Sequence, residues 1–382
     1  MIKNLALVLV SVLLGLAFAE AISRLIYADS DKQVATFRVT RSGIHQDDAQ
    51  LGWVPKPLQH GEHPLPHNAT TRFSTNSLGL RGPEVPTVKP EGVQRIVVVG
   101  DSFVWGWGID DGQTFPDQLG AGRSDRQIIN LGVIGYGLLQ EMQYFQRMAA
   151  ALAPDAVVLS FCENDVVATT VDFHRHGGSG SDSSTGIAAQ GSYGVATKLK
   201  RWLSQSSALY RLANDVVMSN KSLMRLAVQL HFKDGFGGYD ELDDNLRPFL
   251  TRYPSDLDRQ WRLAMQELLE FKQWADANGI RFIVAVIPAL QSVEDDAFRA
   301  SLASSSYEPA DFDLDRPYVA LAEFCRENRI ELVNPVTAFR EAESRHERLY
   351  LVGDMHFNPQ GHRLFAKAIS DELDAPITAD RR

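Results

Sequence analysis

The amino-acid sequence predicts an α/β fold built on a parallel sheet of five strands. Short runs of β-branched and other apolar residues alternate with segments in which apolar residues recur every three or four positions. The first pattern is typical of buried strands and the second of amphipathic helices. Their alternation implies parallel strands joined by right-handed helical crossovers. The expected strands are Arg95 to Val99, Gln127 to Leu131, Ala156 to Phe161, Arg281 to Ile287 and Ile330 to Val333.

Helices are expected between these strands and after the last one. The chain turns toward a helix around Thr114 to Leu119, and Leu138 to Leu152 carries apolar residues along one face. A longer helix over about Leu257 to Ala277 leads into the fourth strand. The last helix begins at Asn358 as its N-cap, with Pro359 at its first position, where a missing N–H costs nothing.

The N-terminus carries an uncharged run, Leu5 to Ala19, just after Lys3. Its length suits the core of a signal peptide, and Ala17-Phe18-Ala19 fits a small-x-small cleavage site. An uncleaved membrane anchor over residues 1–27 is equally open, although a bilayer span needs about 20 apolar residues. Both alternatives predict export to the periplasm or to the outer face of the inner membrane. N-terminal sequencing of the mature protein would distinguish them.

Three regions follow this segment. Residues 28–92 are rich in Pro, His and turn formers, and we expect an N-terminal extension packed on the main domain. The main domain is expected at 93–376, interrupted by an insertion at about 166–255. Within the insertion, Gly177 to Gly194 is small and polar, whereas Leu199 to Leu230 has a helical pattern. We therefore expect a largely helical insertion that covers the carboxyl ends of the strands as a lid.

The composition excludes several classes of function. The chain has 382 residues, 44% of them hydrophobic, and a formal net charge of −10. Nucleic-acid binding needs a basic face, so this charge argues against a nucleic-acid partner. Two cysteines, Cys162 and Cys325, are too few for a disulfide framework, and neither lies in a metal-ligand spacing. We expect no metal and no cofactor.

A candidate nucleophile follows the first strand, in Gly100-Asp101-Ser102. A serine at the carboxyl end of a parallel strand lies at the edge where open α/β sheets bind their ligands. The tripeptide alone is weak evidence, because similar tripeptides often only end a strand. For Asp101 we favour a structural hydrogen bond at the turn over a chemical role.

Two further blocks leave the second and third strands. Asn130-Leu131-Gly132-Val133-Ile134-Gly135-Tyr136-Gly137 is rich in glycine, which allows the backbone to approach a ligand and to turn an N–H toward it. Glu163-Asn164-Asp165 places an amide side chain at the same edge. In isolation, each block is more often a simple turn.

The fourth block, Asp354-Met355-His356, precedes the last helix. Residues two positions apart on an extended segment face the same side, so Asp354 can contact His356. A carboxylate beside an imidazole fixes its tautomer and stabilises its cation, as a general base requires. Such a pair is otherwise often part of a surface loop.

The four blocks in this order resemble the SGNH (GDSL-type) hydrolase superfamily over roughly Val93 to Leu373. The resemblance implies a flavodoxin-like three-layer sandwich and catalysis through an acyl-serine. It implies that Ser102 is the nucleophile, His356 the base and Asp354 its orienting partner. It also implies an oxyanion hole made by the N–H groups of Ser102 and Gly135 and the amide of Asn164. One departure is that only Met355 separates the Asp from the His, a spacing that also occurs in branches resembling polysaccharide acetylation proteins.

The expected function is an exported serine esterase that removes small acyl groups, O-acetyl above all, from a carbohydrate or similar ester. A polysaccharide O-acetyltransferase with the same triad is the alternative, since the acceptor decides between water and a sugar. A non-catalytic carbohydrate-binding protein on the same fold is a second alternative. For Trp105 and Trp107, which flank the nucleophile turn, we favour core packing over substrate stacking.

Overall fold

The computed structural model describes residues 11, 15–24, 44–65, 70–86, 88–167, 207–210, 212–213, 242, 244–303, 305 and 307–375. Most of the N-terminal run and most of the insertion lie outside these residues. The signal peptide or anchor, the helical insertion and its action as a lid therefore stay predictions. Among the described residues, no helix is both long and apolar enough to cross a membrane.

The chain forms two compact units. The larger comprises Thr40–Asp182, Asp243–Ser301 and Glu308–Arg382, and the smaller comprises Met1–Val39, Ser183–Leu242 and Leu302–Tyr307. In the smaller unit, the Glu20 carboxylate accepts hydrogen bonds from the Ser207 hydroxyl and from the N–H groups of Ala208 and Leu209. The larger unit holds the sheet and all four sequence blocks.

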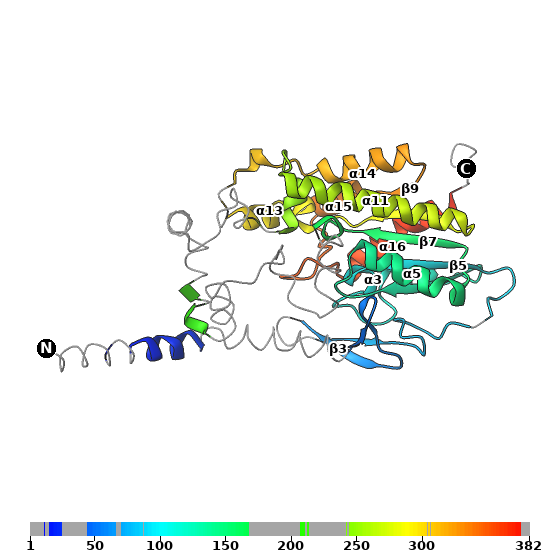
Figure 1. The fold of residues 1–382 in the computed structure, drawn as a ribbon, viewed down its shortest axis with the longest axis horizontal. Helices are drawn as coiled ribbons and strands as arrows, with labels where there is room; N and C mark the ends of the chain where they lie inside the picture. The colour runs from blue at the N-terminus through cyan, green and yellow to red at the C-terminus, as the bar shows by residue number, and fades with distance from the viewer. Residues whose placement is uncertain are drawn as a thin grey trace. The chain divides into compact units, whose positions relative to one another are not determined.

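A five-stranded parallel sheet lies at the centre of the larger unit, as the sequence predicts (Figure 1). Its strand order is β6-β5-β7-β8-β9. The chain therefore adds β6 on one side of β5 and the later strands on the other side, which makes the boundary between β5 and β7 the topological switch point. In flavodoxin-like folds, ligands bind beside the carboxyl ends of the strands at this point. The strands are β5 (Gln94–Gly100), β6 (Arg126–Gly132), β7 (Ala156–Phe161), β8 (Arg281–Val286) and β9 (Glu331–Val333).

The predicted strand ends are correct to within one residue. The fifth strand begins at Glu331 and not at Ile330, because the Ile330 N–H donates to the carbonyl of Cys325 at the end of α14 (Arg316–Glu327). The fourth ends at Val286, before Ile287 and Pro288.

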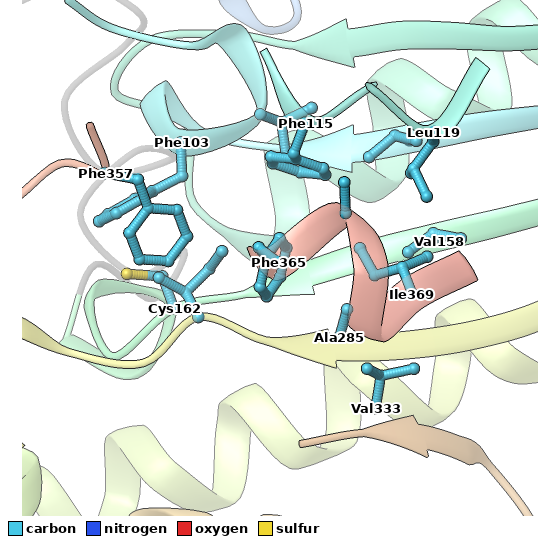
Figure 2. Close-up of a cluster of buried hydrophobic side chains, with 14 of the residues drawn as sticks. Phe103, Phe115, Leu119, Val158, Cys162, Ala285, Val333, Phe357, Phe365 and Ile369 are labelled. Atoms are coloured by element: carbon cyan, nitrogen blue, oxygen red, sulfur yellow. The ribbon is translucent and has the colours of Figure 1, made fainter. Parts of the chain in front are cut away.

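Helices cover both faces of the sheet and complete three layers. One face packs against α4 (Phe115–Gly120), α15 (Val336–Ser344) and α16 (Pro359–Asp374), whose apolar residues share a buried cluster with the strands. Figure 2 shows Phe365 and Ile369 of α16 within this cluster. The other face packs against α5 (Leu138–Leu152) and α11 (Ser255–Ala277), where Phe271 contacts both Phe145 and Phe282. The shorter elements are α3 (Ser102–Trp105), α6 (Asn164–Val167), η3 (Asp244–Phe249), α12 (Leu290–Val293), α13 (Asp295–Leu302) and η4 (Pro309–Asp311).

The start of the last helix is as predicted. The Asn358 side chain accepts hydrogen bonds from the N–H groups of Gln360 and Gly361, which would otherwise lack partners in the first turn. A Cβ at Gly361 would lie 2.2 Å from the Leu349 carbonyl oxygen, so only glycine fits there. This cap fixes the position of the segment just before it, which carries Asp354 and His356.

Two antiparallel hairpins precede the sheet. One pairs β1 (His45–Asp48) with β2 (Gly52–Pro55), and the other pairs β3 (His60–Pro64) with β4 (Thr70–Ser74). The indole N–H of Trp53 donates to the carbonyl of Ile134 at 3.1 Å, in the turn after β6. These hairpins therefore contact the loops at the carboxyl ends of the strands.

Arg81 fixes the segment that follows α3. Its side chain is 2% exposed and donates to the carbonyl oxygens of Trp105, Gly106 and Ile109 at 2.7, 2.6 and 2.5 Å. Burial lowers the pKa of Arg81, while its partner Asp111 acts in the opposite direction. Because the Arg81 guanidinium binds three carbonyl oxygens of this loop, it fixes the loop backbone.

Candidate active site

The turn after β5 presents Ser102 at the first position of α3. Asp101 is the N-cap of this short helix, and its carboxylate accepts a hydrogen bond from the Phe103 N–H at 2.9 Å. A Cβ at Gly100 would lie 2.4 Å from the side chain of Val104, so glycine permits the tight turn. Ser102 remains half-buried, with its hydroxyl directed toward the last of the four blocks. The structural role favoured for Asp101 is confirmed.

Ser102, His356 and Asp354 lie in one chain of hydrogen bonds. The hydroxyl of Ser102 is 2.7 Å from Nε2 of His356, and Nδ1 of His356 is 2.5 Å from Oδ1 of Asp354. The same Asp354 oxygen also accepts the backbone N–H of His356 at 2.9 Å. An ionised Asp354 can only accept, so Nδ1 carries the proton and Nε2 is left to accept one from Ser102. Such an arrangement can activate a serine hydroxyl as a nucleophile.

The Asp354 carboxyl is held in its ionised form. Burial raises its pKa, but hydrogen bonds from the ring and the backbone N–H of His356 outweigh burial and lower the pKa below its ordinary value. The imidazole of His356 also packs on the ring of Phe103, with 4.8 Å between ring centroids. The base is therefore oriented from two sides.

Gly135 lies on an exposed turn beyond β6, with φ of +78°, a conformation that favours glycine. The Val133 N–H donates to the carbonyl of Gly100 at 3.0 Å, which attaches this turn to the nucleophile turn. Within the described part of the chain, the N–H groups of Ser102 and Gly135 donate to no protein acceptor. Both groups can therefore donate to a substrate oxygen.

Asn164 begins α6, just past β7, and its side chain meets the nucleophile turn. Its amide nitrogen donates to the second carboxylate oxygen of Asp101 at 2.7 Å. An amide nitrogen has two hydrogens, so one stays available for a substrate oxygen. The sequence did not reveal this pairing. Asp101 thus caps α3 and orients Asn164 at the same time.

Two buried carboxyl groups lie behind this site and were not foreseen. Glu141 of α5 and Asp165 of α6 are each 1% exposed, and among the residues that the structure describes, neither oxygen of Glu141 has a hydrogen-bond partner. Burial raises the pKa of both groups well above the ordinary value, and repulsion raises it further, from Asp165 and Asp101 for Glu141 and from Asp101 above all for Asp165. We infer that at least one of the two holds a proton. The available signal was the position of Glu141 three residues after Leu138, on the apolar face of the helix.

This inference predicts how stability changes with pH. Folding raises the pKa of such a carboxyl group. Its contribution to the free energy of unfolding is therefore complete at pH values below the pKa of the unfolded state, which is about 4.3 for Glu. That contribution is lost as pH rises toward the folded pKa, by about 1.4 kcal/mol per pH unit for one group. Glu141→Gln cannot ionise, so its Tm should fall less than that of the wild type between pH 6 and 10. Glu91→Gln, an exposed change, is the control and should follow the wild type. Equal slopes for all three proteins would contradict a buried, protonated Glu141.

The structure also places the tryptophans and cysteines that the sequence analysis singled out. Trp105 is fully buried and Trp107 is 9% exposed, and both belong to one buried apolar cluster, so the core-packing prediction is confirmed for both. Cys162 and Cys325 are buried free thiols. All four blocks meet at the carboxyl edge of the sheet, where β5, β6 and β7 end.

Comparison with known proteins agrees with this arrangement. Residues 98–364 match the model of the GDSL-like Lipase/Acylhydrolase family. This match covers most of the sheet and all four blocks, so the chain belongs to the GDSL-like lipase/acylhydrolase family, within the SGNH superfamily. It is a hydrolase that acts on ester bonds. No curated protein matches the chain.

Solved structures give weaker likenesses. A member of the lipolytic G-D-S-L family from Veillonella parvula is 12% identical, with a TM-score of 0.38, and the match covers 73% of this chain and 97% of that one. A GDSL-like lipase from Bacteroides thetaiotaomicron is 13% identical, with a TM-score of 0.39 and coverage of 76% and 92%. A lipase/acylhydrolase from Enterococcus faecalis is 13% identical, with a TM-score of 0.38 and coverage of 74% and 95%. The family assignment depends on the sequence match alone.

Proposed function

We propose that the protein is an exported serine esterase that removes small acyl groups, O-acetyl above all, from a carbohydrate or a similar ester. The observation that carries the proposal is the hydrogen-bonded chain from Ser102 through His356 to Asp354. These three side chains have the order of nucleophile, base and orienting carboxylate that acyl transfer requires.

In the first half of the reaction, His356 takes the proton of the Ser102 hydroxyl as its oxygen attacks the ester carbonyl carbon. The carbonyl oxygen becomes an oxyanion, which accepts hydrogen bonds from the N–H groups of Ser102 and Gly135 and from the Asn164 amide. The intermediate then expels the alcohol, which leaves with the proton from His356. Ser102 now carries the acyl group.

In the second half, His356 takes a proton from water as the water oxygen attacks the acyl-serine. The second oxyanion is held by the same donors, and as it collapses the bond between the acyl carbon and the Ser102 oxygen breaks and His356 returns its proton to that oxygen, which releases the carboxylic acid and the free Ser102 hydroxyl. Asp354 stays ionised throughout and stabilises the imidazolium form of His356. Because the same N–H groups serve both halves, one oxyanion hole is sufficient.

One alternative keeps the triad and changes the acceptor. The Asp354-x-His356 spacing resembles that of polysaccharide acetylation proteins, which supports an O-acetyltransferase in which a sugar hydroxyl attacks the acyl-serine. Incubation with a labelled acetyl donor and a polysaccharide would distinguish the two reactions. Label released as acetate supports the esterase, and label retained on the polysaccharide supports the transferase.

The proposal predicts that Ser102 is labelled by a serine-directed phosphonate and that hydrolysis favours short acyl chains. Mass spectrometry should place a single phosphonate on the peptide that contains Ser102, with loss of activity in proportion to labelling. The heat-unfolded protein is the control and should stay unlabelled, since activation depends on His356.

Rates on activated acetyl, butyryl and octanoyl esters measure the chain-length preference. Labelling elsewhere would overturn the assignment of the nucleophile, and faster turnover of octanoyl esters would overturn the small acyl group.

A further inference from the structure

The turn that carries Gly135 has a central peptide bond that decides where the Gly135 N–H points. The Tyr136 N–H donates to the carbonyl of Val133 at 3.2 Å, which closes a β-turn with Ile134 and Gly135 at its two central positions. The φ of Gly135 is +78° and that of Ile134 is not positive, so the turn is of type II. In a type I turn the central peptide is rotated by roughly 180°, and the Gly135 N–H would point the opposite way.

The Trp53 indole binds the carbonyl oxygen of this same peptide. Its N–H donates to the carbonyl of Ile134 at 3.1 Å. The peptide is trans, so the Ile134 carbonyl and the Gly135 N–H point in opposite directions. A Cβ at Gly135 would lie 3.6 Å from Cζ2 of Trp53, so the ring lies beside the turn. The bond from Trp53 therefore also fixes the Gly135 N–H, which points away from the indole.

The first N-terminal hairpin holds Trp53 against the turn. Trp53 belongs to β2, and its own carbonyl accepts a hydrogen bond from the Tyr136 hydroxyl. The rings of Trp53 and Tyr136 also pack together, with 5.6 Å between centroids. In β1, the paired strand, Asp48 forms an ion pair with Arg147 of α5 at 2.7 Å. The hairpin is therefore attached both to the turn and to the helix that follows it.

We propose that Trp53 is a positioning residue of the oxyanion hole, because it keeps the Ile134–Gly135 peptide in the form that presents the Gly135 N–H to the substrate. The proposal depends on the acyl-serine mechanism above, in which Gly135 is a donor. Glycine adopts positive and negative φ about equally readily, so the turn alone does not select one form. The Trp53 bond exists only in the type II form and shifts the equilibrium toward it. A donor that is already oriented stabilises an oxyanion without reorganisation. Trp53 precedes residues 98–364, so a hairpin outside the part that matches the family completes the site.

The test compares two matched variants. Trp53→Phe removes the indole N–H that the Ile134 carbonyl accepts, and Tyr136→Phe removes the hydroxyl that the Trp53 carbonyl accepts. Each variant loses one hydrogen bond between the hairpin and the turn, so both should lower the Tm to a similar extent. Trp53→Phe should lower kcat on an activated acetyl ester by about 10- to 100-fold with KM little changed, because a whole oxyanion donor is worth about 100- to 1,000-fold and here it is misdirected in only part of the molecules. Tyr136→Phe should lower kcat less than about 3-fold. Equal loss of kcat in the two variants, or an unchanged kcat in Trp53→Phe, would overturn the proposal.

A double-mutant cycle separates positioning from a general structural effect. Gly135→Ala disfavours the positive φ and so favours the flipped peptide. If Trp53 acts through this peptide, Trp53→Phe should have little further effect on kcat in a protein that already carries Gly135→Ala. Independent effects, with the two losses multiplying, would overturn the positioning role. The underlying mechanism is tested separately by Ser102→Ala. An active Ser102→Ala would refute the acyl-serine mechanism, whereas an inactive Ser102→Ala beside a fully active Trp53→Phe would refute only the role of Trp53.

Discussion

Replacement of Ser102 by alanine is expected to lower kcat on ester substrates by roughly 10⁴- to 10⁶-fold. The variant keeps the oxyanion donors but has no nucleophile, so no acyl-enzyme can form. The fold should survive, because Ser102 is only half-buried and its hydroxyl bonds to His356, while Asp101 caps the helix. Steady-state kinetics on an activated acetyl ester, with a thermal melt of the same sample, measure both quantities.

His356→Ala should have an effect of the same order, because a neutral serine hydroxyl is a weak nucleophile without its base. The double variant should be no less active than either single variant, since the two residues act as a unit. Ser344→Ala, an exposed serine far along the chain in α15, is the matched control and should keep full activity. Full activity in Ser102→Ala would refute the proposed mechanism, whatever the control showed.

The sheet and the positions of the four blocks could be predicted because both are local properties of the sequence. The run Ile96 to Val99 is apolar on both faces and β-branched, a pattern typical of a strand buried within a parallel sheet. The carboxyl ends of parallel strands share one edge, so the residues after β5, β6 and β7 are brought together by topology alone. The partners Ser102 and His356, 254 residues apart, could be paired only through the resemblance to SGNH hydrolases, because His356 follows α15 and not a strand of this edge.

The supports of the site could not be predicted, because they depend on contacts between elements without a periodic pattern. The hairpins of residues 45–74 are short and polar, and their alternation is too brief to identify them as strands. The bonds from Arg81 to three carbonyls require the folded loop after α3 to exist first. The Asp101–Asn164 pair joins residues 63 positions apart, and each has a common local explanation as a cap or a turn former.

Asn164→Ala is expected to lower kcat by roughly 100- to 1,000-fold with KM little changed. The amide of Asn164 is already oriented by Asp101, so its second hydrogen is directed without reorganisation toward the oxygen on which charge develops. A donor of this kind binds the oxyanion more strongly than the ground-state carbonyl, so its loss appears in kcat. Kinetics on activated acetyl esters give the two parameters.

The loss of Asn164 also removes a donor from Asp101, and a second variant separates this effect from the effect on the oxyanion. Val104→Ala perturbs the same capped turn by shortening a buried side chain of α3, yet it keeps the Asn164 amide, the Asp101 cap and the Phe103 ring that packs on His356. If disturbance of the turn explained the loss, Val104→Ala and Asn164→Ala would bind a phosphonate transition-state analogue equally well at equal Tm. If the amide stabilises the oxyanion, Asn164→Ala should bind the analogue more weakly, in proportion to its loss of kcat. A folded Asn164→Ala protein with unchanged kcat would make Asn164 a turn residue only, and the oxyanion would have to be held by Ser102 and Gly135 alone.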